Sequence, residues 1–300
     1  MNIFFASSHE LSAPIAKKLI DLGLISGFIT NPDKPSGRKR EISPNGFAIW
    51  AQKTQFPIYK TDKTAEISSL IKKHSIDLII TCAFGLFISE ELLKLPKFGW
   101  LNIHFSLLPK YRGAAPAQRA LMNGDSITGI SIFKLDEGLD TGDILYKEEY
   151  HIPKNIGSRD LLDNLANIAA NAMPKLLKDF SSAKFMPQDG KPSFAPKIQK
   201  SENKVNWEST SRNILNLYRG LEINGGLHAI FRGEKILLLK MTSSEIKLQP
   251  GEIKVIEEDL MVGTGDASVL IHELKPAGKN AMSAKEWLNG ARLTSGEKFE

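Results

Sequence analysis

The sequence predicts an α/β fold in which a doubly wound, mostly parallel Rossmann-like sheet precedes a smaller OB-like β-barrel. Over the first half of the chain, short β-branched or aromatic runs alternate with amphipathic stretches, as in successive βαβ units. This periodicity stops at residues 181–200, where three prolines occur. Beyond residue 205, short apolar runs are separated by glycine-containing turns, which is typical of a small barrel.

In the first domain, expected strands and helices alternate in chain order. The expected strands are residues 2–6, 25–30, 57–59, 77–83, 100–104, 128–135 and 144–149. The expected helices are residues 13–22, 44–53, 64–74, 89–95, 114–123 and 158–180. Because a helix separates most neighbouring strands, we expect most of the sheet to be parallel.

The second domain is expected to be mainly β. We predict a catalytic domain over residues 1–182, a linker over 183–204 and a C-terminal domain over 205–300. In the C-terminal domain, a helix at 209–221 precedes five short strands at 227–231, 235–239, 251–255, 260–263 and 268–274. A last helix, residues 283–289, is indicated by an N-cap serine at Ser283 with Glu286 three residues later.

Composition indicates a soluble globular protein with a local excess of positive charge. Hydrophobic residues make up 42% and charged residues 24% of the 300 positions, and no apolar run has the length of a membrane span. We therefore expect a cytoplasmic protein. The net charge is +5, yet residues 201–300 contain 13 basic and 14 acidic side chains. The excess lies earlier and is concentrated at Lys34, Arg38, Lys39 and Arg40, where a polyanionic partner could bind.

A polar pair ends the strand expected at 100–104. Period-two alternation places Asn102 and His104 on one face, and ligands of open parallel sheets bind beyond the carboxyl ends of the strands. The loop 136–143 joins the next two strands with two glycines and three aspartates, and we expect Asp140 to reach His104. A carboxylate there would raise the pKa of the imidazole, and the Asn102 amide offers a donor to an oxyanion.

This set of groups favours acyl transfer without a covalent intermediate. The chain lacks a Gly-x-Ser-x-Gly elbow, and its one cysteine, Cys82, lies in an apolar run where a buried structural thiol is expected. Asp136 and Asp143 are interpreted as turn residues. No Cys or His pattern has zinc-ligand spacing, so no metal is expected. An amine substrate would attack the acyl group directly, and the residues alone leave both substrates open.

The segment Asn102-x-His104-x-Ser106-Leu107-Leu108-Pro109 with Arg112-Gly113, followed by Leu139-Asp140-Thr141-Gly142-Asp143, resembles the signature of the folate-dependent formyltransferases. Further segments are similar to the members that formylate methionine on initiator tRNA. These segments are Arg112-Gly113-Ala114-Ala115-Pro116-x-Gln118-Arg119, Ala195-Pro196-Lys197-Ile198, Asn206-Trp207, Lys275-Pro276-Ala277-Gly278-Lys279-x-x-Met282 and Trp287-Leu288-Asn289-Gly290. The likeness covers nearly the whole chain.

The resemblance implies 10-formyltetrahydrofolate as formyl donor and initiator methionyl-tRNA as acceptor. It assigns catalysis to three residues: Asn102 holds the formyl oxygen, His104 polarises it and moves protons, and Asp140 supports His104. It also implies that the folate contacts three segments, namely Ser106, Leu107, Leu108 and Pro109; Phe84, Gly85, Leu86 and Phe87; and Glu137, Gly138 and Leu139.

The basic segment resembles the loop with which this family approaches the tRNA acceptor end. We expect Lys34, Arg38, Lys39 and Arg40 to contact tRNA phosphates from a loop that Pro35 and Gly37 favour. We expect a monomer. Two alternatives stay open: a formyltransferase acting on a ribotide or sugar-nucleotide amine, and a non-catalytic RNA-binding protein with the same fold.

Overall fold

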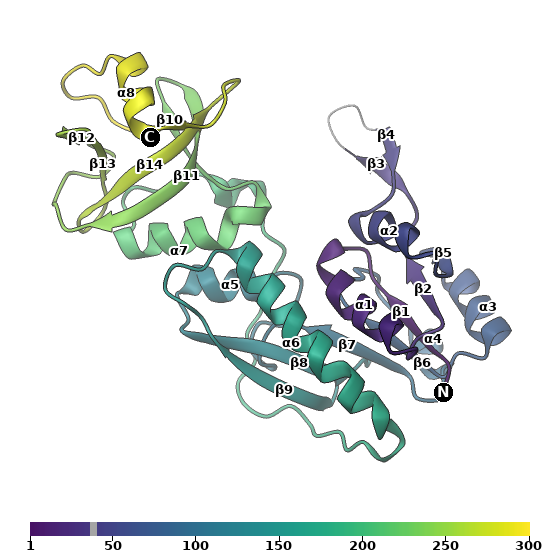
Figure 1. The fold of residues 1–300 in the computed structure, drawn as a ribbon. Helices are drawn as coiled ribbons and strands as arrows, with labels where there is room; N and C mark the ends of the chain where they lie inside the picture. The colour runs from purple at the N-terminus through teal and green to yellow at the C-terminus, as the bar shows by residue number, and fades with distance from the viewer. Residues whose placement is uncertain (37–40) are drawn as a thin grey trace. The chain divides into compact units, whose positions relative to one another are not determined.

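The structure is a computed structural model that describes residues 1–36 and 41–300. Its contacts divide the chain into two compact units, each built from three segments (Figure 1). Unit 1 comprises residues 1–116, 127–152 and 161–196. Unit 2 comprises residues 117–126, 153–160 and 197–300.

Unit 1 is built on a seven-stranded sheet with the strand order β5-β2-β1-β6-β7-β8-β9. The strands are β1 (Ile3–Ala6), β2 (Gly27–Thr30), β5 (Ile58–Lys60), β6 (Leu78–Thr81), β7 (Trp100–His104), β8 (Ile127–Lys134) and β9 (Ile144–His151). The first five strands of this order pair in parallel, whereas β8 and β9 pair antiparallel. The predicted mostly parallel sheet is therefore confirmed, with an antiparallel pair added at one edge.

Helices cover both faces of this sheet. The helices are α1 (Ala13–Asp21), α2 (Gly46–Ala51), α3 (Thr64–His74), α4 (Glu90–Lys94) and α6 (Ser158–Lys178). Phe4 of β1 shares a buried cluster with apolar residues of α3 and α4, and its neighbour Phe5 contacts Phe47 of α2 at 5.8 Å between ring centroids. Successive side chains of a strand point to opposite faces, so each face of β1 is apolar. In Figure 1, α1 and α6 lie in front of the strands.

The segment that precedes α2 differs from the loop that the sequence predicts. The strands β3 (Lys34–Ser36) and β4 (Glu41–Ser43) pair as a two-stranded antiparallel sheet. Lys34 of the basic segment therefore lies in a short strand. Lys34 is exposed and its ammonium lies 3.3 Å from the Asp62 carboxylate. Arg38, Lys39 and Arg40 lie outside the described residues.

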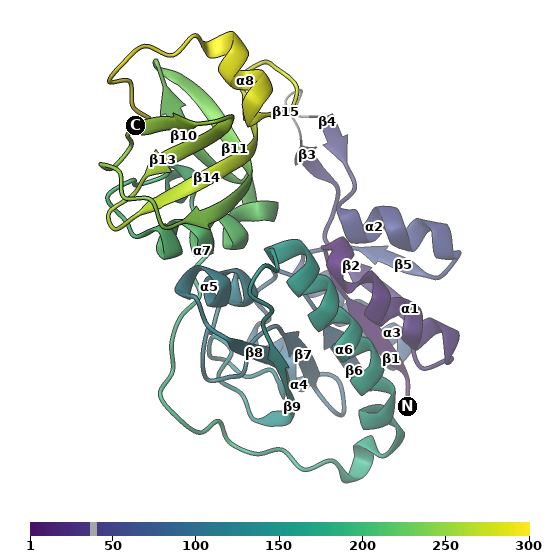
Figure 2. The same cartoon turned by 60° about the vertical axis from the view of Figure 1, so that its left-hand side comes forward.

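Unit 2 contains the predicted C-terminal β domain, whose strands pair antiparallel. Its sheet has the order β10-β11-β14-β13-β12, and β15 pairs with β14. The strands are β10 (Leu227–Phe231), β11 (Glu234–Ser244), β12 (Ile253–Ile256), β13 (Asp259–Gly263), β14 (Ser268–Pro276) and β15 (Met282–Ser283). Figure 2 shows them with α7 (Ser211–Leu221) and α8 (Ala284–Ala291), both of which contact the sheet. The helix α5 (Pro116–Asn123) contributes most of its residues to this unit.

The end of the chain is fixed by local capping and by aromatic packing. The predicted N-cap of α8 is confirmed, because Ser283 and Glu286 form a reciprocal capping box. Phe299 is buried and lies within 6.0 Å of the rings of Trp207, Phe231 and Trp287. Phe299 is therefore part of the core of unit 2.

The proline-containing segment that follows α6 is extended and belongs to unit 1 as far as Pro196. It is not free of that unit, because its backbone pairs with residues that follow β7. Arg112 N donates to Ser193 O at 2.8 Å, and Ala195 N donates to Arg112 O at 2.7 Å. Within the described residues, no helix combines the length and apolarity needed to cross a membrane.

Candidate active site

The end of β7 holds the polar pair that the sequence singles out. Asn102 and His104 lie two residues apart on this strand and therefore face the same side. On the neighbouring parallel strand, β6, the register pairs Thr81 with Asn102. Three polar side chains thus lie at the carboxyl ends of two adjacent strands, where open α/β sheets bind ligands.

Thr81 orients the Asn102 amide. The Thr81 hydroxyl lies 2.8 Å from Asn102 Oδ1 and donates to it; Leu101 O, at 3.1 Å, is the alternative acceptor for the same hydrogen. This contact occupies the amide oxygen of Asn102. Its Nδ2 has no hydrogen-bond partner among the residues described here, so two N–H donors are available to a bound oxygen.

His104 is buried, and its tautomer is fixed by a backbone carbonyl. The side chain is 5% exposed, and Nε2 lies 2.9 Å from Tyr111 O. A carbonyl oxygen only accepts, so Nε2 carries the proton and the lone pair of the neutral ring is at Nδ1. Nδ1 is the ring atom that can accept a proton.

The sequence-based expectation for the pKa of His104 is wrong. Burial lowers this pKa below its ordinary value, and the opposing influence of the Asp140 carboxylate and of the Tyr111 carbonyl does not compensate. The physical reason is that burial removes water from the imidazolium form. This loss of solvation disfavours the charged ring more than the nearby carboxylate favours it. His104 is therefore poised as a neutral proton acceptor.

Asp140 lies beside His104 because its loop folds back along β7. The loop leaves β8 next to Trp100, where Leu135 N donates to Trp100 O at 2.9 Å. Asp140 Oδ2 nevertheless lies 3.6 Å from His104 Nδ1, at the other end of the strand, and accepts a hydrogen bond from Gly113 N at 2.7 Å. The expected approach of Asp140 to His104 is thus present, at a distance longer than a hydrogen bond.

The shape of this loop depends on its small and acidic residues. Asp136 closes a turn by accepting from Gly138 N at 3.1 Å and from Thr141 Oγ1 at 2.6 Å, as the sequence predicts for this residue. A Cβ on Gly142 would lie 1.8 Å from Lys134 O, so no larger residue fits there. Asp140 itself has a left-handed backbone with φ of 52°, a region that aspartate tolerates better than most residues.

Residues 106–109 form a tight loop after β7. Ser131 of β8 is fully buried, donates its hydroxyl to Ser106 O at 2.7 Å and accepts from Leu108 N at 3.0 Å. The Ser106 hydroxyl donates to Lys110 O at 2.6 Å, and the Leu108–Pro109 peptide is cis. These buried contacts hold the loop in one conformation beside His104.

The other two segments that the resemblance assigns to folate each lie beside further parts of unit 1. Phe84 O accepts hydrogen bonds from Ser8 Oγ and from Asn31 Nδ2, both at 3.1 Å, so the loop after β6 is tied to the loops after β1 and β2. The pKa of Lys94 in α4 is raised by a hydrogen bond to Glu90 and, less strongly, by the charge of Glu137. The 136–143 loop therefore runs close to α4.

Two apolar side chains of these segments are exposed. Phe87 is 79% and Leu139 is 60% exposed, whereas Phe84 is buried. Phe87 and Leu139 therefore offer apolar surface that a ligand could cover.

Sequence reasoning missed four residues that shape the site. Thr81 orients Asn102, Tyr111 fixes the tautomer of His104, and Ser131 holds the 106–109 loop. Gln188 donates to the backbone of the Asp140 loop. For Thr81 a signal exists, since it ends a buried strand that neighbours β7, whereas Gln188 lies in a segment without periodicity.

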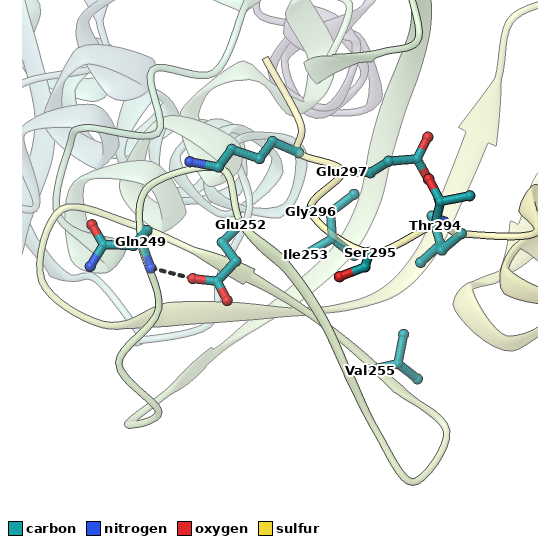
Figure 3. A pocket seen from close by; sticks show the side chains of 10 residues that line it. Gln249, Glu252, Ile253, Val255, Thr294, Ser295, Gly296 and Glu297 are labelled. Carbon is teal, nitrogen blue, oxygen red and sulfur yellow. Dashed lines mark hydrogen bonds between the residues drawn. The ribbon is translucent and has the colours of Figure 1, made fainter.

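Other reactive features of the chain do not contribute to this site. Cys82 is buried, as the sequence predicts, and burial raises the pKa of its thiol to about 12, which disfavours the reactive thiolate. No group of three or more His, Cys, Asp or Glu in the described part of the chain could hold a metal ion. A cavity of about 500 Å³ in unit 2 is lined by β12 and residues 293–298; Figure 3 shows Gln249 N donating to Glu252 at 2.8 Å there. Its lining contains no residue of the site around His104.

Two family models match the chain in sequence order. Residues 4–177 match the model described as formyl transferase, and residues 197–292 match the formyl transferase C-terminal domain. The chain belongs to the formyl transferase family. The expected fold and the expected family are therefore both confirmed.

Within this family, curated relatives resemble the chain over its whole length. The methionyl-tRNA formyltransferase of Caldicellulosiruptor saccharolyticus is 35% identical over an alignment of 308 positions, which covers 99% of this chain and 99% of the relative. Among solved structures, methionyl-tRNA formyltransferase from Clostridium thermocellum has a TM-score of 0.59 at 17% identity, over 81% of this chain and 94% of that one. HypX from Aquifex aeolicus, in complex with tetrahydrofolic acid, has a TM-score of 0.66 at 19% identity, over 95% of this chain and 46% of that one.

Proposed function

We propose that this protein transfers the formyl group of 10-formyltetrahydrofolate to the α-amino group of methionyl initiator tRNA. The observation that carries the proposal is the site at the end of β7. There the Asn102 amide, whose oxygen accepts from Thr81 and whose Nδ2 is available, lies on the same strand face as the buried neutral imidazole of His104. The Asp140 carboxylate lies 3.6 Å from that imidazole. Full-length similarity to methionyl-tRNA formyltransferases supports this acceptor over others.

The groups of the site suit a direct transfer. The acceptor nitrogen attacks the formyl carbon, the bond from that carbon to N10 of the donor breaks, the amine loses a proton and N10 gains one. Asn102 Nδ2 donates to the oxygen on which negative charge develops. His104 accepts a proton at Nδ1, and the Asp140 carboxylate stabilises the imidazolium that results. Asp140 also assists protonation of the leaving nitrogen through water.

The donor would be held by the three segments around this site. Ser106, Leu107, Leu108 and Pro109 form the ordered loop beside His104. Leu139 and Phe87 offer exposed apolar surface, and Glu137, Gly138, Phe84, Gly85 and Leu86 supply neighbouring groups. The residues fit a folate, because an apolar ring and several backbone polar groups can be bound together there.

The acceptor would meet the basic segment after β2. Lys34, Arg38, Lys39 and Arg40 would neutralise phosphates near the acceptor end of the tRNA, although Lys34 is partly neutralised by Asp62. Residues 205–300 would supply further backbone contacts from a domain that begins after the 183–204 linker. We also propose that the protein is a cytoplasmic monomer.

The test is a transfer assay with labelled formyl donor. Methionyl initiator tRNA, methionyl elongator tRNA, free methionine, a ribotide amine and a sugar-nucleotide amine are offered separately. The expected result is efficient transfer to the initiator tRNA alone, and a loss of at least about a hundredfold for N102A. Transfer only to the ribotide or the sugar nucleotide would establish the alternative enzyme. Tight tRNA binding without any transfer would favour a non-catalytic RNA-binding protein.

A further inference from the structure

The segment after α6 reaches the Asp140 loop through one side chain. Gln188 Nε2 donates to Asp140 O at 2.8 Å and to Gly142 O at 2.9 Å. Its Oε1 accepts from Arg112, at 3.2 Å from Nε and 2.6 Å from Nη2. The amide thus uses both of its hydrogens and its oxygen in contacts with two loops that are far apart in sequence.

These contacts close a ring around Asp140. Gln188 holds the backbone of Asp140, and Arg112 holds Gln188. The next residue after Arg112 is Gly113, whose N–H donates to Asp140 Oδ2 at 2.7 Å. The backbone of Asp140 is therefore held by Arg112 through Gln188. Its carboxylate is held by Gly113, the residue next to Arg112.

Asp140 needs such support. Its φ of 52° is a left-handed conformation that costs free energy in any residue except glycine, and it persists only where surrounding contacts determine it. A rotation of this backbone would swing Oδ2 away from His104 Nδ1, which lies 3.6 Å away. Only the Gln188 amide donates to both Asp140 O and Gly142 O among the side-chain contacts of the described residues.

We propose that Gln188 is a positioning residue, which fixes the Asp140 loop so that the carboxylate faces His104. Arg112 is its partner, because the guanidinium sets the orientation of the amide and thereby presents the Nε2 hydrogens to the loop. The segment after α6 is then a part of the active site as well as a connection to the C-terminal domain. This inference rests on the proposed role of Asp140 in formyl transfer.

The first test compares two replacements of Gln188 in the full-length protein. Q188E keeps the size and the contact with Arg112 but turns a carboxylate oxygen toward two carbonyl oxygens. Q188M keeps the length and removes all hydrogen bonds. Both should lower kcat for formyl transfer by about tenfold to a hundredfold, because small displacements of a catalytic group have effects of this size. KM for the methionyl-tRNA should change by less than about twofold, since tRNA contacts are untouched. Q52E, at an exposed position, is the matched control and should behave as wild type.

A second test separates positioning from general stability. In a D140A background, Q188M should add less than about twofold to the loss, because the carboxylate that it positions is absent. R112M should lower kcat as Q188M does, and the two changes together should cost no more than one alone. If Q188M lowers the melting temperature, Q188E and R112M provide the same comparison in folded protein.

The inference is overturned if Q188E and Q188M keep the wild-type kcat, or if their losses are undiminished in D140A. Additive losses for R112M and Q188M would also overturn it. These results are distinct from a failure of the proposed function. The proposed function fails if the wild-type protein does not transfer formyl to methionyl-tRNA, or if D140A is as active as wild type. The inference about Gln188 then fails as well.

Discussion

Replacing Thr81 by valine should slow formyl transfer by about fivefold while leaving the fold intact. The Thr81 side chain is 4% exposed, and its hydroxyl donates to Asn102 Oδ1 at 2.8 Å. Valine has nearly the same shape, so the main loss is one neutral hydrogen bond, worth about 1 kcal/mol. Because 1.36 kcal/mol corresponds to about tenfold in rate, the expected factor is about five.

The assay is kcat at saturating folate and methionyl-tRNA, with thermal unfolding measured in parallel because Leu101 O also lies within reach of the hydroxyl. T81S retains the hydroxyl and should keep close to the wild-type rate. In an N102A background, T81V should have no further effect, since the amide that it orients is gone. The reasoning is refuted if T81V matches wild type in kcat, or if T81S is slowed as much as T81V.

Four further outcomes follow from the structure. Burial lowers the pKa of His104 from 6.5. The value of kcat/KM should therefore stay level as the pH falls from about 8 and decline only below 6.5. A decline of kcat/KM with its midpoint above about pH 7 would contradict this. As the pH falls, the His104 imidazole is protonated in the unfolded chain before it is protonated in the folded one. The free energy of unfolding should therefore fall as the pH drops through 6.5, and H104N should weaken this dependence in denaturant titrations. G142A should lose more than about tenfold in kcat because its Cβ would meet Lys134 O, whereas G290A, where a Cβ meets nothing within 4 Å, should remain active. F299A should lower the free energy of unfolding by about 3–5 kcal/mol, measured by denaturant titration; an effect below about 1 kcal/mol would show that Phe299 is not part of the core.

Local patterns were sufficient for most of the elements and for the identity of the central polar residues. The run that became β6 is visible as a short, continuous apolar stretch, and the run that became β7 is visible because Asn102 and His104 alternate with apolar residues. Ser283 and Glu286 marked the start of α8 because a capping box involves only residues close in sequence. The strands β3 and β4 were not predicted, because each has only three residues and a pattern of that length carries no clear period.

The sequence by itself determined the α/β class, the family resemblance and the choice of Asn102, His104 and Asp140, because periodicity and motif spacing are properties of neighbouring residues. Only the tertiary structure decided which atom of His104 is free, that its pKa is lowered, and that Thr81 and Gln188 orient its neighbours. Burial depends on everything packed around a group. Hydrogen bonds that join positions 48 residues apart, as Gln188 and Asp140 are, leave no periodic signal in the chain.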